Sequence, residues 1–209
     1  MNTIRILIAD DHAVVRMGLS ALFGTETGLE VVGMTKNGDE AVRETIRLRP
    51  DVVVMDLMMP KKDGAKATRD ILERLPTTKV VILTSFATSD GIAQALKAGA
   101  VGAVMKSAEN AELVSAIRKV AAGNRYVSPE IRNLIASDPP ISDLSDRQYE
   151  VLHSLSLGLT NKDIARQLDI SERCVEVHID RLLSKIGAAN RTEAVAIALR
   201  KHLLRNPPA

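Results

Sequence analysis

Short apolar runs alternate with helix-like apolar stripes five times along the first 123 residues of the chain. The runs are Ile4–Ala9, Glu30–Met34, Val52–Asp56, Lys79–Thr84 and Val101–Met105. Three of these runs consist almost entirely of Val, Ile and Leu, which is typical of strands that helices cover on both faces. Between the runs, apolar residues recur at helical spacing, as at Leu113, Val114, Ile117 and Val120. The pattern predicts an α/β domain built on a doubly wound, five-stranded parallel sheet.

The rest of the chain has a different pattern. A short helix is predicted over residues 128–137, and the Asp-Pro-Pro that follows at residues 138–140 is typical of a linker. From residue 143 onward strand patterns are absent, and four helices are predicted from residues that favour helix starts. These residues are Ser145, Thr160, Ser171 and Asn190. We therefore expect a domain over residues 1–123, a linker over residues 124–143, and a smaller all-α domain over residues 144–209.

The composition narrows the class of protein. No apolar run approaches the ~18 residues that a membrane-spanning helix needs. The N-terminus enters a strand pattern at once and lacks the apolar core of a signal peptide, so we expect a cytoplasmic protein without a membrane partner. The single Cys174 fits a reducing compartment. The net charge of +2 identifies no partner, but residues 181–209 carry six Lys or Arg against one acid.

Reactive side chains stand at the ends of four predicted strands. Asp10 and Asp11 follow the first strand, Asp56 ends the third, Thr84 ends the fourth and Lys106 follows the fifth. Because ligands bind at the carboxyl ends of parallel strands, we expect these side chains to converge. Carboxylates, a hydroxyl and an ammonium group together suit a divalent cation and a phosphoryl group.

A simpler explanation exists for each acid alone, because aspartate at a strand end commonly caps the following helix. That explanation accounts poorly for the ordered appearance of acids, hydroxyl and lysine on four strand ends. We therefore predict a Mg²⁺ site with Asp11 and Asp56 as direct ligands and Asp10 acting directly or through water. Asp56 is the predicted nucleophile, since aspartyl-phosphate is an established covalent intermediate.

The segments ADDHAVVRMGL, VVVMDLMMPKKDG, VVILTSF and GAVGAVMKSA resemble the receiver domains of bacterial response regulators, over roughly residues 1–123. The resemblance implies that Asp56 accepts a phosphoryl group from a partner histidine kinase. It also implies that Asp11, Asp56 and the backbone carbonyl of Met58 hold Mg²⁺ with help from Asp10, and that Thr84 and Lys106 bind the phosphoryl group. One position departs from the family, since receivers usually carry an aromatic residue where this chain has Ala103.

The second domain contains a predicted helix-turn-helix. The Ile164–Leu168 helix is followed by a short turn over residues 169–171 and by a second helix. A buried stripe is expected in the second helix at Val175, Ile179, Leu182, Leu183 and Ile186. The outward set is then Glu172, Arg173, Glu176, Val177, Asp180, Arg181 and Ser184. A recognition helix presents such an outer face to the major groove of DNA.

Residues 144–204 resemble the LuxR-type (NarL/FixJ-type) DNA-binding domain. A receiver followed by this domain implies a response regulator that binds double-stranded promoter DNA, forms a homodimer when phosphorylated and is not an enzyme. The predicted DNA-binding residues are Lys162, Arg173, Glu176, Val177, Asp180, Arg181, Lys185 and Arg191. Lys162 and Lys185 are the leading candidates for phosphate contacts, and Val177 for a thymine methyl. In the last helix, predicted from Thr192 to Leu204, an apolar stripe that includes Leu199 packs on its own domain or on a second copy.

Two acidic residues in the second helix leave open whether and how the domain binds DNA. Glu176 and Asp180 stand where relatives commonly carry Lys or Arg, and residues 143–180 hold eight acids against four Lys or Arg. The chain therefore binds a cytosine-containing site weakly as a dimer, or binds DNA only after phosphorylation or with a partner, or acts through protein partners alone. The rivals from another class are an aspartate-nucleophile phosphohydrolase and a flavodoxin-like cofactor binder. Asp10-Asp11-His12 would repel a flavin phosphate, and no segment remains to build a substrate cap.

Overall fold

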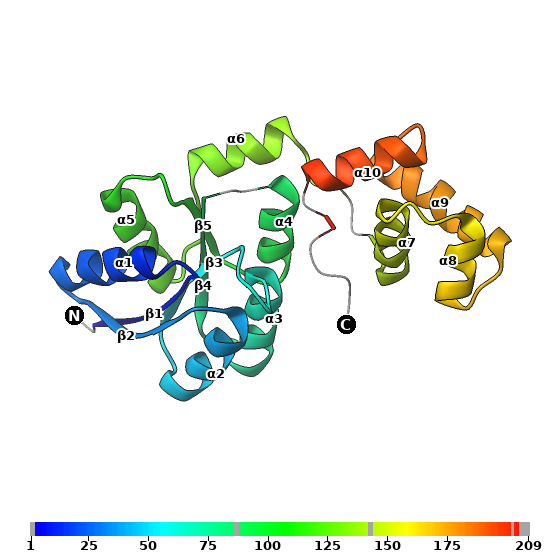
Figure 1. Ribbon diagram of the computed structural model, residues 1–209. Coiled ribbons are helices and arrows are strands. Elements are labelled where there is room, and N and C mark those ends of the chain that lie inside the picture. Colours follow the sequence, from blue (N-terminus) through cyan, green and yellow to red (C-terminus); the bar gives the residue numbers. More distant parts are fainter. Residues whose placement is uncertain (1–2, 86–87, 142–143, 202, 205–209) are drawn as a thin grey trace. The chain divides into compact units, whose positions relative to one another are not determined.

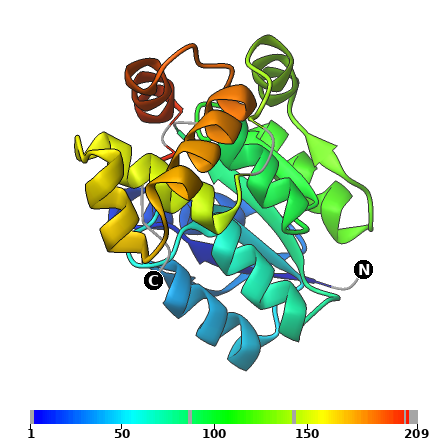
Figure 2. The same cartoon turned by 90° about the vertical axis from the view of Figure 1, so that its right-hand side faces the viewer.

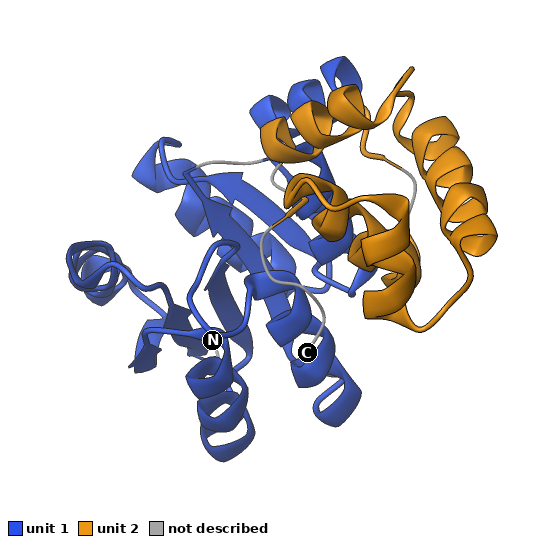
Figure 3. Cartoon of the chain, turned by 45° about the vertical axis from the view of Figure 1, so that its right-hand side comes forward, with its two compact units in different colours: residues 1–138 blue, residues 139–209 orange. Residues whose placement is uncertain are grey.

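The computed structural model describes residues 3–85, 88–141, 144–201 and 203–204. The chain divides into two compact units, Met1–Asp138 and Pro139–Ala209 (Figure 3). The first unit is an α/β sheet domain and the second is helical, as the change of pattern along the sequence predicts. Among the described residues, no helix combines the length and apolar character needed to cross a membrane.

The first unit contains a parallel sheet with the strand order β2-β1-β3-β4-β5-β6 (Figure 1). The strands are β1 (Ile4–Ala9), β2 (Leu29–Thr35), β3 (Val52–Asp56), β4 (Lys79–Thr84), β5 (Gly102–Met105) and β6 (Tyr126–Val127). The predicted parallel α/β sheet is confirmed, but it has six strands and the prediction of five is wrong. β6 has two residues, too few to show a strand pattern in the sequence. Backbone pairing with β5 places it in the sheet, since Tyr126 N–H bonds to the Val101 carbonyl at 3.0 Å.

Helices cover both faces of this sheet (Figures 1 and 2). They are α1 (Ala13–Thr25), α2 (Gly38–Leu48), α3 (Gly64–Arg74), α4 (Ser89–Lys97), α5 (Asn110–Ala121) and α6 (Pro129–Ser137). Alternate residues of each strand enter two separate apolar clusters, because side chains of a strand point to opposite faces. Ile6 and Ile8 pack with Phe23 of α1 and Ile117 of α5, whereas Leu7 joins the cluster under the other helices.

The predicted short helix after residue 128 is confirmed as α6. The Ser128 side chain caps it by accepting from the Ile131 N–H, and Pro129 occupies its first turn. Ile131 is fully buried and belongs to the same apolar cluster as Ile92 of α4. β6 and α6 therefore fill much of the range 124–143 in which we expected a linker, and the first compact unit extends to Asp138.

The second unit packs its helices around one apolar cluster. The helices are α7 (Asp146–Ser156), α8 (Asn161–Leu168), α9 (Glu172–Ile186) and α10 (Arg191–Arg200). The side chains of Ser145, Thr160, Ser171 and Asn190 cap these helices, as their positions in the sequence predict. Gly187 ends α9 in the left-handed conformation, with φ of 75°. The last helix ends at Arg200, before the predicted end at Leu204.

Candidate functional site

Four neighbouring strands bring the predicted reactive groups to one edge of the sheet. Asp10 follows β1, Asp56 ends β3, Thr84 ends β4 and Lys106 follows β5, and these strands are adjacent in the order β1-β3-β4-β5. The register aligns the ends, because Thr84 lies opposite Met105 and the Lys106 N–H donates to the Thr84 carbonyl at 2.8 Å. The predicted convergence of residues separated by nearly a hundred positions follows from this topology.

A buried ion-pair triad lies at the centre of the site. The Lys106 Nζ is 2.5 Å from Asp10 Oδ2 and 3.0 Å from Asp56 Oδ2. The side chains of Asp10 and Asp56 are only 2% and 4% exposed, so water contributes little to the solvation of either carboxylate. A single ammonium group therefore separates two buried acids that would otherwise repel each other.

Burial shifts the proton affinities of these groups. Desolvation raises the pKa of the Asp56 carboxyl above its ordinary value, although Lys106 and the backbone N–H of Met58 partly oppose the shift. Desolvation would lower the pKa of Lys106, but its hydrogen bonds and charge interactions with Asp10 and Asp56 outweigh that effect and raise it. Lys106 is consequently held as a cation beside the carboxylate of Asp56.

The acid cluster suits a divalent cation. One ligand atom from each of Asp10, Asp11, His12 and Asp56 lies within 4.8 Å of the others. Three carboxylates face one ammonium group, so the pocket retains excess negative charge, and carboxylate oxygens are the ligands that Mg²⁺ prefers. The residues therefore fit the predicted metal. The Met58 backbone N–H is close enough to the Asp56 carboxyl to lower its pKa, while the Met58 carbonyl as a ligand stays a prediction.

His12 was not among the predicted site residues. Its Nδ1 lies 2.7 Å from Asp11 Oδ1 and 3.3 Å from Asp10 Oδ1, and its backbone N–H donates to Asp10 Oδ1 at 2.8 Å. Its position directly after Asp11 was the only signal in the sequence. The main-chain bond from His12 orients one oxygen of Asp10, while the other oxygen contacts Lys106.

Thr84 presents an unused hydroxyl group. The residue is fully buried, and among the described residues its Oγ1 is the buried side-chain atom for which the structure contains no hydrogen-bond partner. A buried hydroxyl without a partner costs about 1–3 kcal/mol of stability. Its position at the end of β4, next to the strand that carries Asp56, fits a donor kept for a bound phosphoryl oxygen.

Ala103 lies inside the sheet and is fully buried. It pairs with Ile82 on β4 and Val127 on β6, and it shares an apolar cluster with Ile131 of α6. A methyl side chain in this place has no alternative inward and outward positions. In receivers the aromatic residue at this position rotates inward when the Thr or Ser hydroxyl engages phosphate, and Ala103 cannot make such a movement.

In the helix-turn-helix, the buried and exposed residues of the second helix follow the predicted pattern. Asp169 ends α8 in the left-handed conformation, with φ of 52°, and Ser171 caps α9 two residues later. Every residue of the predicted outward set is exposed. The predicted buried stripe is also found, although Leu183 is only partly buried.

The predicted DNA-contacting side chains differ in their exposure and in their contacts within the protein. Lys162, Arg173 and Arg181 are exposed. Two others have protein partners, since Lys185 Nζ lies 3.2 Å from Gln148 Oε1 and Arg191 donates to Asn161 Oδ1 at 2.9 Å. Arg191 thereby ties the start of α10 to the start of α8, the first helix of the helix-turn-helix.

The outer face of α9 carries both signs of charge. Glu176 and Asp180 are exposed on it, between Arg173 and Arg181 in the sequence, and Val177 is 40% exposed. Acids on this face repel DNA phosphates but can accept a hydrogen bond from cytosine N4.

Comparisons with known proteins identify the family of each part of the chain. Residues 6–118 match the family described as response regulator receiver domain, and residues 142–198 match bacterial regulatory proteins of the luxR family. The transcriptional regulatory protein LiaR of Bacillus subtilis is 36% identical over 209 residues, which cover 96% of this chain and 99% of LiaR. The chain belongs to the LuxR family of two-component response regulators. The response regulator protein VraR of Staphylococcus aureus is 34% identical, with 97% of this chain and 100% of VraR covered.

Solved structures of LuxR-family regulators share the architecture. Response regulator ChrA of a heme-sensing two-component system is 35% identical with a TM-score of 0.58, and the match covers 97% of this chain and 100% of ChrA. A LuxR-family regulator from Aurantimonas sp. SI85-9A1 is 40% identical with a TM-score of 0.62, covering 65% of this chain and 97% of that one. A complex of the response regulator RcsB with DNA has a TM-score of 0.68 over 95% of this chain and 98% of that one, and at 22% identity it shows the fold alone.

Proposed function

We propose that a sensor histidine kinase phosphorylates this response regulator on Asp56 in the cytoplasm, and that phosphorylation controls dimerisation and sequence-specific binding to promoter DNA. The main support for the proposal is that the buried acids Asp10 and Asp56 both form ion pairs with Lys106. Thr84 at the end of the neighbouring strand has a hydroxyl group with no hydrogen-bond partner among the described residues. If these residues served only to cap helices, there would be no reason to bury them together. Two acids, an ammonium group and a hydroxyl without a partner among the described residues are instead buried at four strand ends.

The phosphoryl transfer assigns a role to each group. A carboxylate oxygen of Asp56 attacks the phosphorus of the kinase phosphohistidine, so that an O–P bond forms, the N–P bond breaks and the imidazole leaves with the electron pair. Asp10, Asp11, Asp56 and the carbonyl of Met58 would hold Mg²⁺, which when bound neutralises charge between the acids and the phosphoryl oxygens. Lys106 pairs with one phosphoryl oxygen and Thr84 donates to another.

The helical unit supplies the output. The exposed face of α9 enters the major groove, and the cations Lys162, Arg173, Arg181, Lys185 and Arg191 contact backbone phosphates. Among the relatives, LiaR is described as a transcriptional regulatory protein, and RcsB has been solved in complex with DNA. We infer that this chain regulates transcription in the same way, with residues 1–123 as the phosphoacceptor part and residues 144–209 as the DNA-binding part.

Phosphorylation is tested by mass spectrometry of the intact protein after incubation with acetyl phosphate and Mg²⁺. We expect the wild type to gain one phosphoryl group and Asp56→Asn to gain none. The matched control is Asp51→Asn, because Asp51 is an exposed acid just before the same strand. Labelling of Asp56→Asn to the wild-type level would remove the assignment of the phosphoacceptor.

An alternative output is regulation through protein partners without DNA binding, and the exposed acids Glu176 and Asp180 favour it. The two outputs are separated by selecting genomic DNA fragments on the immobilised full-length protein at low salt, with and without acetyl phosphate. Enrichment of defined fragments supports the DNA-binding proposal. Retention of no fragment in either state would favour the protein-partner output.

A further inference from the structure

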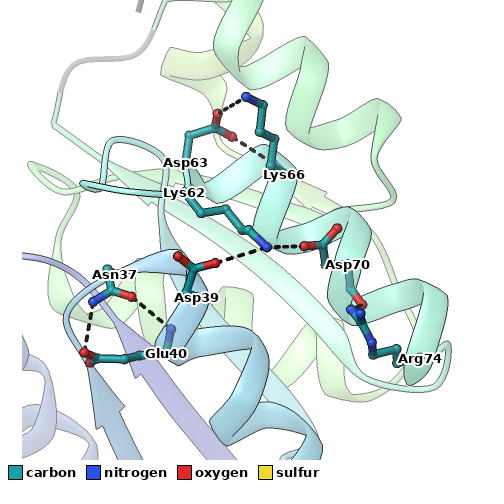
Figure 4. A network of polar contacts seen from close by, with 8 residues as sticks. All are labelled: Asn37, Asp39, Glu40, Lys62, Asp63, Lys66, Asp70 and Arg74. Carbon is teal, nitrogen blue, oxygen red and sulfur yellow. Dashed lines mark hydrogen bonds and ion pairs between the residues drawn. The ribbon is translucent and has the colours of Figure 1, made fainter. Parts of the chain in front are cut away.

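A second polar cluster lies between α2 and α3 (Figure 4). At its centre the ammonium group of Lys62 contacts two acids from different helices. Lys62 Nζ is 3.2 Å from Asp39 Oδ1 of α2, and it also bonds to Asp70 Oδ2 of α3. The side chains of Lys62 and Asp70 are 26% and 30% exposed, so their ion pair is partly shielded from water, whereas Asp39 is 43% exposed.

Lys62 belongs to the loop that leaves the phosphoacceptor. Residues 57–63 join Asp56, the last residue of β3, to Gly64, the first residue of α3. The N–H of Gly64 closes this loop by donating to the Leu57 carbonyl at 2.9 Å. The same loop carries Met58, whose backbone N–H lies close enough to the Asp56 carboxyl to oppose the rise in its pKa. The position of the loop therefore decides which main-chain groups face the acidic pocket.

The loop is closely packed and conformationally strained. Lys61 has a φ of 68°, a left-handed conformation that costs a non-glycine residue roughly 1 kcal/mol. A Cβ atom on Gly64 would lie 2.3 Å from the Asp56 carbonyl oxygen, and one on Gly38 of α2 would lie 2.4 Å from the Lys62 carbonyl oxygen. The surrounding structure must hold such a loop in place, because the backbone alone would relax out of the strained conformation.

We propose that Lys62 is a positioning residue for phosphorylation of Asp56. Its contacts with Asp39 and Asp70 anchor the 57–63 loop to α2 and α3, and the anchored loop holds the Met58 main chain at the pocket. The proposal rests on phosphorylation of Asp56 as described under Proposed function. Removal of the ammonium group would release the loop and also leave Asp39 and Asp70 without the cation between them.

The test compares variants of the full-length protein. Lys62→Met removes the charge and keeps a long side chain, and Lys62→Arg keeps the charge. Lys66→Met is the matched control, because Lys66 Nζ lies 4.0 Å from Asp63 on the more exposed side of the same cluster (Figure 4). The pair Asp39→Asn with Asp70→Asn removes both partners while Lys62 remains, which keeps the test open if Lys62→Met folds poorly.

Two measurements are made on each variant. The first is amide hydrogen exchange of the 57–63 segment, without Mg²⁺ or phosphoryl donor. The second is the rate of phosphorylation by acetyl phosphate as a function of Mg²⁺ concentration. We expect Lys62→Met and the double acid variant to exchange faster in this segment and to need more Mg²⁺ for half-maximal rate. We also expect their phosphorylation to slow by about tenfold, since loss of positioning away from the reacting atoms commonly costs up to ~10²-fold.

Lys62→Arg should restore both properties, and Lys66→Met should match the wild type in both. If the wild type is phosphorylated and Lys62→Met shows the wild-type rate and Mg²⁺ dependence, the positioning role is refuted while the proposed function stands. Faster exchange without any change in phosphorylation also overturns it, since the contacts then only stabilise the loop. If the wild type accepts no phosphoryl group, the proposed function fails first and the role of Lys62 fails with it.

Discussion

At the scale of single residues, the acidic pocket keeps groups that oppose folding. Asp10 and Asp56 are buried next to each other, and the buried hydroxyl of Thr84 has no hydrogen-bond partner among the described residues. Each of these features costs stability, because charges and polar groups lose their hydration on burial. The proposed binding of Mg²⁺ and a phosphoryl group would restore the missing interactions and so explain why these groups lie at one point.

Thr84→Val tests this explanation, because valine has nearly the shape of threonine and lacks the hydroxyl. We expect the free energy of unfolding of the unphosphorylated protein to rise by about 1–2 kcal/mol, since an unsatisfied buried hydroxyl is removed. The measurement is urea denaturation, followed in the first unit by hydrogen exchange of strand peptides. Thr84→Ser, which keeps the hydroxyl, should show no such gain.

The same pair of variants tests the function of the hydroxyl. Thr84→Val should accept a phosphoryl group from acetyl phosphate, yet phosphorylation should no longer increase its dimerisation or DNA binding. Thr84→Ser should respond as the wild type does. A response of Thr84→Val equal to that of the wild type would show that the hydroxyl does not bind the phosphoryl group.

At the scale of secondary-structure elements, α6 belongs to the core of the first unit. Ile131 is fully buried in the cluster that also holds Ala103, and the Ser128 N–H donates to the Ala103 carbonyl at 2.9 Å. Ser89 at the start of α4 also donates to Asp138, the residue that follows α6, at 3.0 Å. Helix α4 is the next helix after β4, the strand that ends in Thr84, so α6 is joined to an element that follows Thr84 directly in the chain.

Ile131→Ala is therefore expected to destabilise the first unit by about 2–5 kcal/mol, the usual cost of truncating a buried isoleucine. The control is Asn133→Ala on the exposed side of α6, which should change stability by less than about 0.5 kcal/mol. Hydrogen exchange of β5 and β4 peptides in urea measures both. A small effect of Ile131→Ala would mean that α6 is a linker segment and contributes little to the sheet domain.

The exposed acids on α9 lead to a prediction about the salt dependence of DNA binding. Glu176 is exposed on its outer face, so Glu176→Lys replaces a repulsive charge with a phosphate-binding one. We expect tighter binding to unselected DNA and a salt dependence steeper by about one in the log–log slope. Glu73→Lys, an identical charge change at an exposed position of α3, should leave both unchanged. An unchanged slope for Glu176→Lys would show that this face of α9 does not approach DNA.

At the scale of the whole molecule, the two units have separate apolar cores and are joined through the segment that contains Pro139 and Pro140. A signal from Asp56 must therefore change either the first unit's surface or the assembly of two copies. Leu199 of α10 is a large apolar side chain that is 59% exposed, so contact with a second copy would remove apolar surface from water. A two-fold symmetric dimer would match a two-fold symmetric DNA site.

Leu199→Glu should weaken phosphorylation-dependent dimerisation by about two orders of magnitude. Each copy loses the burial of the exposed part of one leucine, worth about 1–2 kcal/mol, which makes about 2–4 kcal/mol per dimer. Light scattering of the full-length protein with acetyl phosphate and Mg²⁺ measures the effect. Leu157→Glu is the control, because Leu157 follows α7 and is 61% exposed. Equal loss in both variants, or in neither, would contradict a dimer surface on α10.

The sequence alone determined the order and type of the main elements, because strands and helices differ in apolar period and their ends carry capping residues. It also predicted that Asp10, Asp11, Asp56, Thr84 and Lys106 would converge. These residues lie at or just after the ends of strands, and a parallel sheet brings such ends together. The outward face of α9 followed from helical spacing in the same way. These features depend on local patterns and on one general rule of topology.

Only the tertiary structure decided the remaining features. β6 is defined by backbone pairing with β5, and two residues contain no pattern of their own. The approach of Asp56 to the local group of Asp10, Asp11 and His12 depends on contacts between distant segments. The same holds for the lack of a hydrogen-bond partner at Thr84 among the described residues and for the ion pairs of Lys62 with Asp39 and Asp70. Such contacts depend on how packed elements meet in space, which periodicity along a single chain does not encode.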